Sequence, residues 1–459
     1  MIKKLQVVFI ALFFVLLALP LLFFNWEENV VSEIDNRQLT NNPFGPNAEP
    51  GTDLTASLES YVQDRIGFRD EMILGYTLLN DQLFHKMIHP LYEYGKDGYV
   101  FFKQKQNVQF GDYHIAFAEM LAEIQDYCEA RDVPFLFVLN PEKAAVYPDK
   151  LRDGIHYDRS WVQQFEQKLD ELGVNYIDNT QLLQDKRAEG EQVFNKVYNA
   201  GHWNDLGAFY GVNNILESLS GFFPSIQPNE PSDFAVTETL QETLLSSQFP
   251  IHEYEPTFGR LCELEVKTEE YDAEVARNSQ HRGFGYFVNP ENVAAGAPKT
   301  LVFQGSYMNE MGFKFLQTGL GEYIYVHNYE NLMDFDYYFN IFQPECVVVE
   351  VAEYTVNSGY FNAERVENFS LPPIFTPDDT ARQADKQSLA PQIAEGERLS
   401  TLTVSLPEGT RYAYLLSEGR TFDLIEGEQG WQASVEKENL SENYEVVAVG
   451  ADGKQTRYQ

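Results

Sequence analysis

The chain has 459 residues, enough for about three units of ~150 residues each, and its 44% hydrophobic and 14% aromatic content is that of a globular protein. With 33 Lys and Arg against 70 Asp and Glu, the formal net charge is −37, which argues against nucleic acid or an anionic lipid surface as a partner. Neutral glycans, cationic partners and bound cations remain open.

The N-terminus carries an apolar run of a length that spans a bilayer. Leu5–Phe24 contains no charged residue, and Lys3 and Lys4 precede it. Acidic residues follow it, so the positive-inside rule predicts a membrane anchor over residues 1–26, with a cytoplasmic amino end and everything after Trp26 outside. A cleaved signal peptide is the alternative, although no small-x-small cleavage site follows Pro20.

Two further segments precede the main domain pattern. Residues 27–57 contain Asn, Pro and Gly without periodicity, which predicts a linker. In residues 58–89 the apolar side chains recur at helical spacing, which predicts helices packed against a core. His85 and His89 are four residues apart, but no third ligand accompanies them, so we predict no metal site there.

Helical and strand patterns then alternate, within a domain expected over residues 58–369. Amphipathic helices, one around Phe117–Cys128 and one around Trp161–Leu172, separate short apolar strands. The strands expected are Pro134–Leu139, Val174–Ile177, Thr300–Phe303, Tyr323–Val326 and Cys346–Val351. Strands that are apolar on both faces and alternate with helices predict an α/β fold, a parallel sheet covered by helices on both sides.

Residues 224–298 interrupt this alternation. They carry scattered charge, which predicts an irregular insertion that either shapes a substrate groove or has no role in the site.

The composition changes again near residue 370. Residues 370–398 are rich in Pro and polar residues and predict a linker, whereas residues 399–459 predict a small all-β domain of short strands separated by turns. Its aromatic residues either stack on sugar rings or fill the core: Tyr412, Tyr414, Trp431 and Tyr444.

The cysteines do not form a disulfide framework. Cys128 and Cys346 lie in apolar patterns typical of core residues, and a Cys128–Cys262 bridge remains an alternative.

Two stretches far apart in the chain carry the candidate chemistry. His202 lies in a small-residue loop just before an apolar helical run, and Asp205 stands where a helix N-cap is expected. Ser306 follows Gly305 in a tight turn between a buried strand and a helix, where backbone amides point at whatever the serine attacks. We predict that both side chains meet at the carboxyl edge of the sheet as nucleophile and base.

Both stretches resemble the SGNH-hydrolase-like family that contains the alginate O-acetylation proteins AlgJ and AlgX and the DHHW proteins. In that family a D-x-H-W motif precedes a G-[TD]-S-[YF] motif, and here His202-Trp203 precedes Gly305-Ser306-Tyr307. Other segments also match the family, and they occur along the chain in the family's order: Glu33–Arg37, Tyr61–Arg69, Gly95–Phe102, Pro141–Tyr147 and Val347–Glu353. The resemblance implies an SGNH-like, flavodoxin-like sheet.

The sequence departs from the family at two positions. Ala200 replaces the aspartate expected two residues before the histidine, and Tyr354 replaces an arginine expected after the Val347–Glu353 segment. Another group must then orient His202. The candidates are a backbone carbonyl, Asn199, an acid distant in the sequence and, as the weakest, Asp205. The remaining candidates for oxyanion or substrate binding are Trp203, Gly305, Tyr307, Asn309, Glu350 and Glu353.

The resemblance implies an extracytoplasmic O-acyltransferase that modifies a cell-surface polysaccharide, with a polytopic membrane acyltransferase as its partner. A carbohydrate esterase of the same fold is one alternative. The other is an inactive domain that binds glycan or serves assembly, because of Ala200. No nucleotide or dinucleotide fingerprint and no Cys/His metal cluster is present, so we predict no cofactor.

Overall fold

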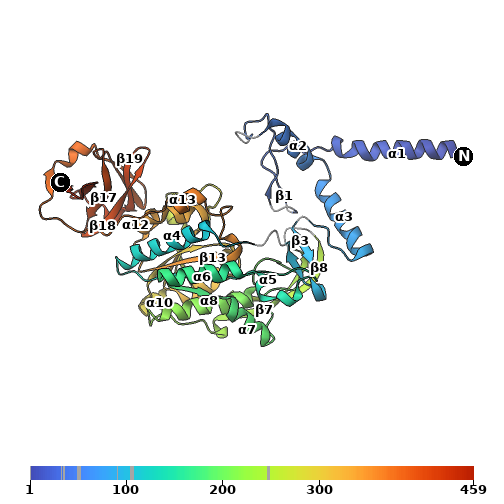
Figure 1. The fold of residues 1–459 in the computed structure, drawn as a ribbon, viewed down its shortest axis with the longest axis horizontal. Coiled ribbons are helices and arrows are strands. Elements are labelled where there is room, and N and C mark those ends of the chain that lie inside the picture. The colour runs from blue at the N-terminus through green and yellow to red at the C-terminus, as the bar shows by residue number, and fades with distance from the viewer. Residues whose placement is uncertain are drawn as a thin grey trace.

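The protein has three parts, which follow one another along the long axis in Figure 1. A computed structural model describes residues 2–32, 34, 37–48, 53–89, 91–103, 108–244 and 249–459. An N-terminal helical arm carries the apolar helix, an α/β domain forms the middle, and a β-sheet domain ends the chain. Glu33, Asp35 and Asn36, which belong to the first of the matching segments, lie outside the described residues.

A 7-stranded sheet forms the centre of the α/β domain, in the order β6-β5-β13-β11-β12-β10-β9. The first five in that order are parallel, and β10 and β9 extend the sheet antiparallel. The strands are β5 (Phe135–Asn140), β6 (Tyr176–Asp178), β9 (Glu265–Val266), β10 (Phe284–Val288), β11 (Lys299–Gln304), β12 (Glu322–His327) and β13 (Cys346–Ala352). The mostly parallel α/β fold expected from the alternation is confirmed.

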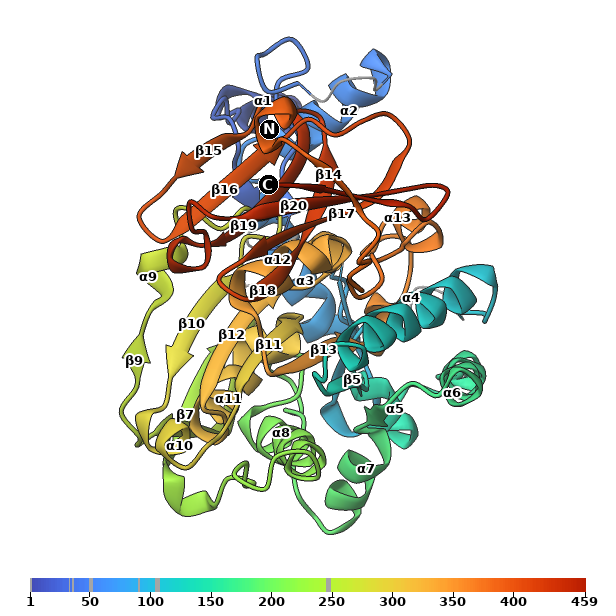
Figure 2. The same ribbon diagram turned by 90° about the vertical axis from the view of Figure 1, so that its left-hand side faces the viewer.

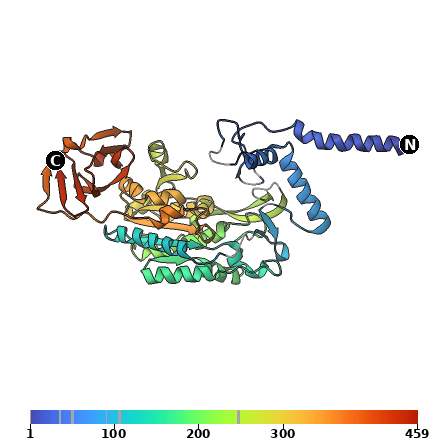
Figure 3. The ribbon, with the colours of Figure 1, turned by 45° about the horizontal axis from the view of Figure 1, so that its top comes forward.

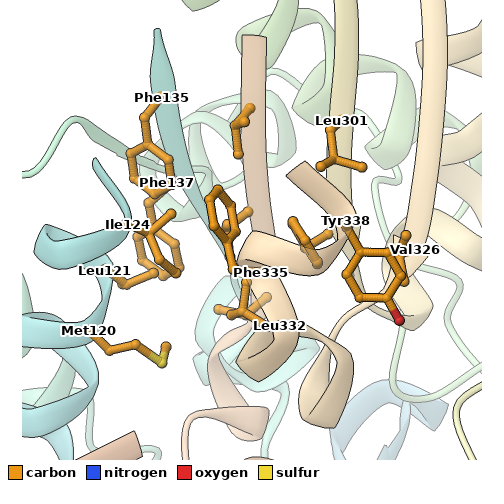
Figure 4. Packing of buried hydrophobic residues seen from close by; sticks show 14 of the residues in the cluster. Met120, Leu121, Ile124, Phe135, Phe137, Leu301, Val326, Leu332, Phe335 and Tyr338 are labelled. Atoms are coloured by element: carbon orange, nitrogen blue, oxygen red, sulfur yellow. The ribbon is translucent and has the colours of Figure 1, made fainter. Parts of the chain in front are cut away.

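Helices cover both faces of this sheet, as Figure 2 shows. Along β13, alternate residues enter different cores: Val347 and Val349 pack on one side, Cys346 and Val348 on the other. Figure 4 shows part of the first core, where Leu121 and Ile124 of one helix face Phe137 of β5. The helices on the first side are α4 (Asp112–Glu129), α6 (Ser160–Leu172) and α12 (Phe335–Phe342); those on the second are α5 (Lys143–Val146), α8 (Asp205–Ser220) and α11 (Phe313–Gly319).

The segment expected as an irregular insertion is ordered instead. It contains a long hairpin, β7 (Phe234–Thr243) and β8 (Pro250–Arg260), and then β9, α9 (Thr268–Tyr271), β10 and α10 (Pro290–Ala294). The strand β10, Phe284–Val288, was missed because it closely follows the long polar run Lys267–Arg282, and its partner β12 lies more than thirty residues further along the chain.

The C-terminal part is an 8-stranded sheet with its own apolar core. It includes β14 (Arg382–Ala384) and β15 (Gln392–Glu395), which lie within the stretch expected as a linker, so the β unit begins before residue 399. Tyr414 and Tyr444 are buried and are not free to stack on sugar. The other strands are β16 (Leu399–Val404), β17 (Thr410–Ser417), β18 (Arg420–Gly427), β19 (Gly430–Glu436), β20 (Glu445–Gly450) and β21 (Gln455–Tyr458).

The C-terminal sheet docks on the α/β domain through Asp423. Its backbone exchanges hydrogen bonds with the Asn340 side chain, at 3.0 Å and 2.8 Å. Its carboxylate accepts hydrogen bonds from the Tyr127 hydroxyl and the Arg131 guanidinium. All three cysteines are unpaired, so there is no Cys128–Cys262 bridge.

The N-terminal arm contains α1 (Ile2–Leu22), α2 (Leu54–Arg65) and α3 (Arg69–Phe84). Among the described residues, α1 is the one helix whose length and composition allow it to cross a membrane. Both a signal anchor and a signal peptide fit such a helix. The prediction that residues 58–89 pack their apolar side chains against a core is wrong for much of α2 and α3, where Leu58, Val62, Met72 and Leu79 are exposed.

Candidate active site

Ser306 and His202 lie together at the carboxyl edge of the central sheet. Ser306 comes two residues after the end of β11, and His202 lies in the loop that precedes α8. The His202 Nε2 atom is 2.8 Å from the Ser306 Oγ atom, although 104 residues separate them in the chain. The structure therefore places the two side chains within hydrogen-bond reach, as a nucleophile and its base require.

The serine is presented by a turn with a buried acid behind it. The Gly305 amide donates to Glu350 Oε2 at 2.7 Å, and the Asn140 side chain donates to Glu350 Oε1 at 2.8 Å. From Ser306 the chain is helical and continues as a π-helical turn over Met308–Gly312 before α11. The Ser306 and Tyr307 amides belong to the first helical turn, where no intrahelical carbonyl is available to them.

Asn199 lies on the other side of the imidazole. Its side-chain oxygen accepts the His202 backbone N–H at 3.1 Å and lies 3.0 Å from Nδ1 of the ring. If Nε2 is to accept the serine proton, Nδ1 must carry a hydrogen and donate it to Asn199. Asn199 has a φ of 50°, a left-handed conformation that Asn tolerates better than most residues.

Glu310 supplies a carboxylate beside the same ring nitrogen. Its Oε2 atom lies 3.5 Å from His202 Nδ1, and the Asn199 side-chain amide donates to the same oxygen at 3.5 Å. Burial lowers the pKa of His202, and the Glu310 carboxylate opposes this by raising it. The ring is therefore neutral at pH 7 and can accept a proton, while Glu310 favours the imidazolium that results.

Two residues of the site, Glu310 and Tyr354, have no role predicted from the sequence. Glu310 is four residues after Ser306, about one helical turn, and this spacing is a signal that could have identified it. The Tyr354 hydroxyl lies 3.3 Å from Ser306 Oγ, so the residue at the position where the resemblance predicts an arginine contacts the serine directly.

The two predictions made for Asp205 are not supported by its contacts. Asn204 is the N-cap of α8, because its side chain accepts the Gly207 amide at 3.0 Å, and Asp205 is the first helical residue. The Asp205 carboxylate accepts the Phe258 amide at 2.8 Å and pairs with Lys314 at 2.6 Å. It therefore ties α8 to the hairpin and to α11, and it is not the group that orients His202.

Most of the predicted substrate-binding side chains are buried and already bonded. The Trp203 indole donates to the Tyr307 carbonyl at 3.1 Å, and the Tyr307 hydroxyl lies between the carbonyls of Pro141 and Gly201 at 2.8 Å and 2.7 Å. Asn309 differs in being only partly buried; its side-chain oxygen accepts a bond from Gln304 at 2.6 Å. These contacts fix the two loops relative to each other.

The surroundings of Glu350 and Glu353 do not support the prediction that these carboxylates bind substrate. Both side chains are buried: Glu350 lies on β13, which is interior in the sheet, and Glu353 lies in the short 3-10 helix that directly follows it. Glu353 accepts hydrogen bonds from the Glu142 amide, the Tyr157 hydroxyl and the Arg159 guanidinium. Among the residues that the structure describes, no group of three His, Cys, Asp or Glu side chains is placed to hold a metal ion.

The hairpin of the insertion braces the His202 loop. Glu253 on β8 accepts the backbone amides of Lys196, Val197 and Tyr198, at 2.5 Å, 2.8 Å and 2.6 Å. Nearby, the Asn195 side chain donates to the buried carboxylate of Glu255. These contacts link the insertion to the loop that carries His202, and they do not show a substrate groove.

Comparison with known proteins agrees with the resemblance seen in the sequence. Residues 93–296 match the family model described as the SGNH hydrolase-like domain of the acetyltransferase AlgX, a range that includes His202 and ends before Ser306. No curated protein sequence matches the chain.

Among solved structures, PatB1 of Bacillus cereus with a sulfonyl adduct is 15% identical, with a TM-score of 0.45, over 60% of this chain and 99% of that one. A DHHW family protein of Eubacterium siraeum is 14% identical, with a TM-score of 0.41, over 62% and 100%. AlgX of Pseudomonas aeruginosa is 14% identical, with a TM-score of 0.41, over 80% and 89%.

Proposed function

We propose that this chain, whose residues 93–296 match the SGNH hydrolase-like domain of the AlgX acetyltransferase family, transfers acetyl or similar acyl groups to hydroxyls of a cell-surface polysaccharide. The observation that carries the proposal is the 2.8 Å approach of His202 Nε2 to Ser306 Oγ, together with Asn199 at Nδ1 of the same ring.

In the first half-reaction Ser306 takes the acyl group from a donor ester or thioester. Its Oγ attacks the acyl carbonyl carbon while His202 Nε2 accepts the hydroxyl proton, and the carbonyl oxygen becomes an oxyanion. The amides of Ser306 and Tyr307 are the donors proposed for that oxyanion. The tetrahedral intermediate then collapses, the leaving group departs with the proton from His202, and an acyl ester remains on Ser306.

In the second half-reaction a sugar hydroxyl takes the place of the leaving group. His202 removes the hydroxyl proton as the sugar oxygen attacks the acyl carbon. When the Ser306 ester bond breaks, His202 returns the proton to Oγ and the serine is restored. Tyr354 contacts the Ser306 oxygen at 3.3 Å, so its hydroxyl is placed to donate to that oxygen while the proton is on the imidazole.

Asn199 and Glu310 together take the role of the aspartate that the resemblance predicts at the position of Ala200. Asn199 fixes the ring orientation through Nδ1, and the Glu310 carboxylate stabilises the imidazolium from 3.5 Å. Both act on His202 and are positioning residues. Asp205 has no part in this arrangement, because its carboxylate is paired with Lys314.

The proposal places the chain on the outer face of a membrane, with α1 as an uncleaved anchor. A polytopic membrane acyltransferase, which the family resemblance implies, is then the source of the acyl group. A neutral or weakly charged glycan is the acceptor most compatible with a net charge of −37.

A serine-directed fluorophosphonate tests the site. The full chain should be labelled at Ser306, with loss of fluoride, and Ser306→Ala and His202→Ala should abolish labelling while the fold is retained. Transfer of acetyl from p-nitrophenyl acetate to an added oligosaccharide then distinguishes a transferase from a carbohydrate esterase, which passes the acyl group to water. Absence of labelling in the folded native chain contradicts the catalytic proposal and favours a glycan-binding or assembly role.

A further inference from the structure

One face of α3 is apolar and exposed. Met72, Tyr76, Leu79 and Leu83 are 46%, 57%, 53% and 62% exposed. Their spacing of four, three and four residues places them on one side of the helix. Thr77 and Asn80 of the same helix are buried, and the Thr77 hydroxyl bonds to the carbonyls of Ile73 and Ile88.

The start of α3 is attached to the end of the apolar helix α1. The Gly67 amide donates to the Pro20 carbonyl at 2.9 Å, and the rings of Phe23 and Phe68 lie 5.0 Å apart. A Cβ atom at Gly67 would come within 2.5 Å of the Phe23 carbonyl oxygen, so this close contact requires glycine. The turn between α2 and α3, at Gly67 and Phe68, therefore packs against the end of α1.

The α3 helix starts at the end of α1 and runs back along the side on which α1 lies. Figures 1 and 3 both show α3 leaving the end of α1 obliquely, with its far end leaning toward the side on which α1 lies. The aromatic residues that follow α1 are themselves exposed, Trp26 at 72% and Phe23 at 61%. Exposed aromatic side chains at the end of a spanning helix are typical of the headgroup region of a bilayer.

We propose that α3 lies in the interface of the bilayer that α1 spans, with Met72, Tyr76, Leu79 and Leu83 inserted at the boundary between headgroups and acyl chains. The occupant of this face is neutral phospholipid, because a chain of net charge −37 is repelled by anionic headgroups and binding must come from apolar area. Two attachments, α1 and α3, then fix the orientation of the α/β domain relative to the membrane, which α1 alone would leave free to swivel.

Depth-dependent quenching in the full-length chain tests this inference. Cys128 and Cys346 are buried, so a Cys262→Ser background leaves a single introduced cysteine as the reactive thiol. Leu79→Cys and, as a control on β15 of the far domain, the exposed Ile393→Cys are labelled with an environment-sensitive nitrobenzoxadiazole and reconstituted in phosphatidylcholine vesicles. The Leu79 probe should show blue-shifted emission and several-fold stronger quenching by lipids with a shallow nitroxide than the Ile393 probe.

The other outcomes overturn the inference in distinguishable ways. Equal quenching at both positions means that α3 does not contact lipid. Emission at Leu79 that changes with the protein-to-lipid ratio but not with nitroxide lipid means that a second copy covers the face. Failure of the chain to float with the vesicles removes α1 as an anchor and the inference with it, but leaves the Ser306 chemistry untouched. Leu83→Glu, at an exposed position, should reduce Leu79 quenching without altering flotation.

Discussion

The side-chain oxygen of Asn199 lies 3.0 Å from Nδ1 of His202, whereas Ser306 is at the other ring nitrogen, Nε2. A triad normally has a carboxylate at this nitrogen, and an amide oxygen can hold the same tautomer because it accepts the same N–H. The amide contributes no negative charge, however, and the Glu310 carboxylate near the same nitrogen can supply it.

Removal of the Asn199 side chain should cost most of the serine reactivity. We choose Asn199→Gly because residue 199 has a φ of 50°, where glycine fits without strain and alanine does not. The free imidazole can then turn or change tautomer, and the rate of fluorophosphonate labelling should fall by about 10²–10⁴. Asn199→Asp should restore it, since a carboxylate accepts the same bond. Labelling of the glycine variant at the native rate would show that Asn199 does not position the ring.

Glu310→Gln should move the pH dependence of labelling. The Glu310 carboxylate raises the pKa of His202, so its removal lowers that pKa and shifts the acid limb of the rate profile to lower pH. The plateau rate should also fall, by roughly 10-fold, because the imidazolium formed during attack loses a neighbouring charge. Glu217→Gln, at an exposed position on α8, is the matched control and should leave both features unchanged. An unshifted acid limb in Glu310→Gln would contradict the role given to Glu310.

Much of this fold follows from local sequence patterns. Ser306 and His202 come together because each follows a strand or precedes a helix in a parallel sheet, and such positions meet at one edge. The strands β5, β11, β12 and β13 were predicted to within one or two residues because each is a short apolar run bounded by turns.

The errors in the site arise from contacts between distant segments. Asp205 pairs with Lys314 and Phe258, which are more than fifty residues away, and no local pattern indicates that. Glu350 and Glu353 were predicted to bind substrate because they stand at the carboxyl end of a strand beside the site. The burial of Glu350 depends on the interior place of β13 in the sheet, and Glu353 is bonded to Glu142, Tyr157 and Arg159, about 200 residues earlier in the chain. The order of strands in the sequence reveals neither.

Ala200→Asp should not restore a family-type triad. Ala200 is 2% exposed and packs in an apolar cluster with Met87, Val100 and Phe249, so a carboxylate there is buried without a partner. We expect the free energy of unfolding to fall by about 1–3 kcal/mol, measured by urea denaturation, with no gain in serine labelling. Ala200→Ser tests whether a smaller polar group is tolerated and should cost less. A more active Ala200→Asp enzyme would show that His202 can use an acid from that side.

Glu350→Gln should change how stability depends on pH. Burial raises the pKa of Glu350 to about 7, although the Gly305 amide and Asn140 oppose the shift. In the unfolded chain the same carboxyl ionises near pH 4.5. Between these values the unfolded state loses a proton that the folded state keeps, so stability from this group is full below about pH 4.5 and declines as the pH rises to about 7.

For a pKa shift of this size, the free energy of unfolding declines by about 3 kcal/mol over that pH range. A neutral glutamine at position 350 removes this pH dependence. The difference in melting temperature between Glu350→Gln and the native chain should therefore grow in favour of the variant from pH 5 to pH 7.5. Measurement of both proteins at each pH cancels the contributions of the other buried acids, since they are common to the pair. Because the amide oxygen that Glu350→Gln introduces can still accept the Gly305 N–H, Ser306 labelling should persist. A pH-independent difference would mean that Glu350 is ionised throughout, held by Gly305 and Asn140 against the cost of its burial.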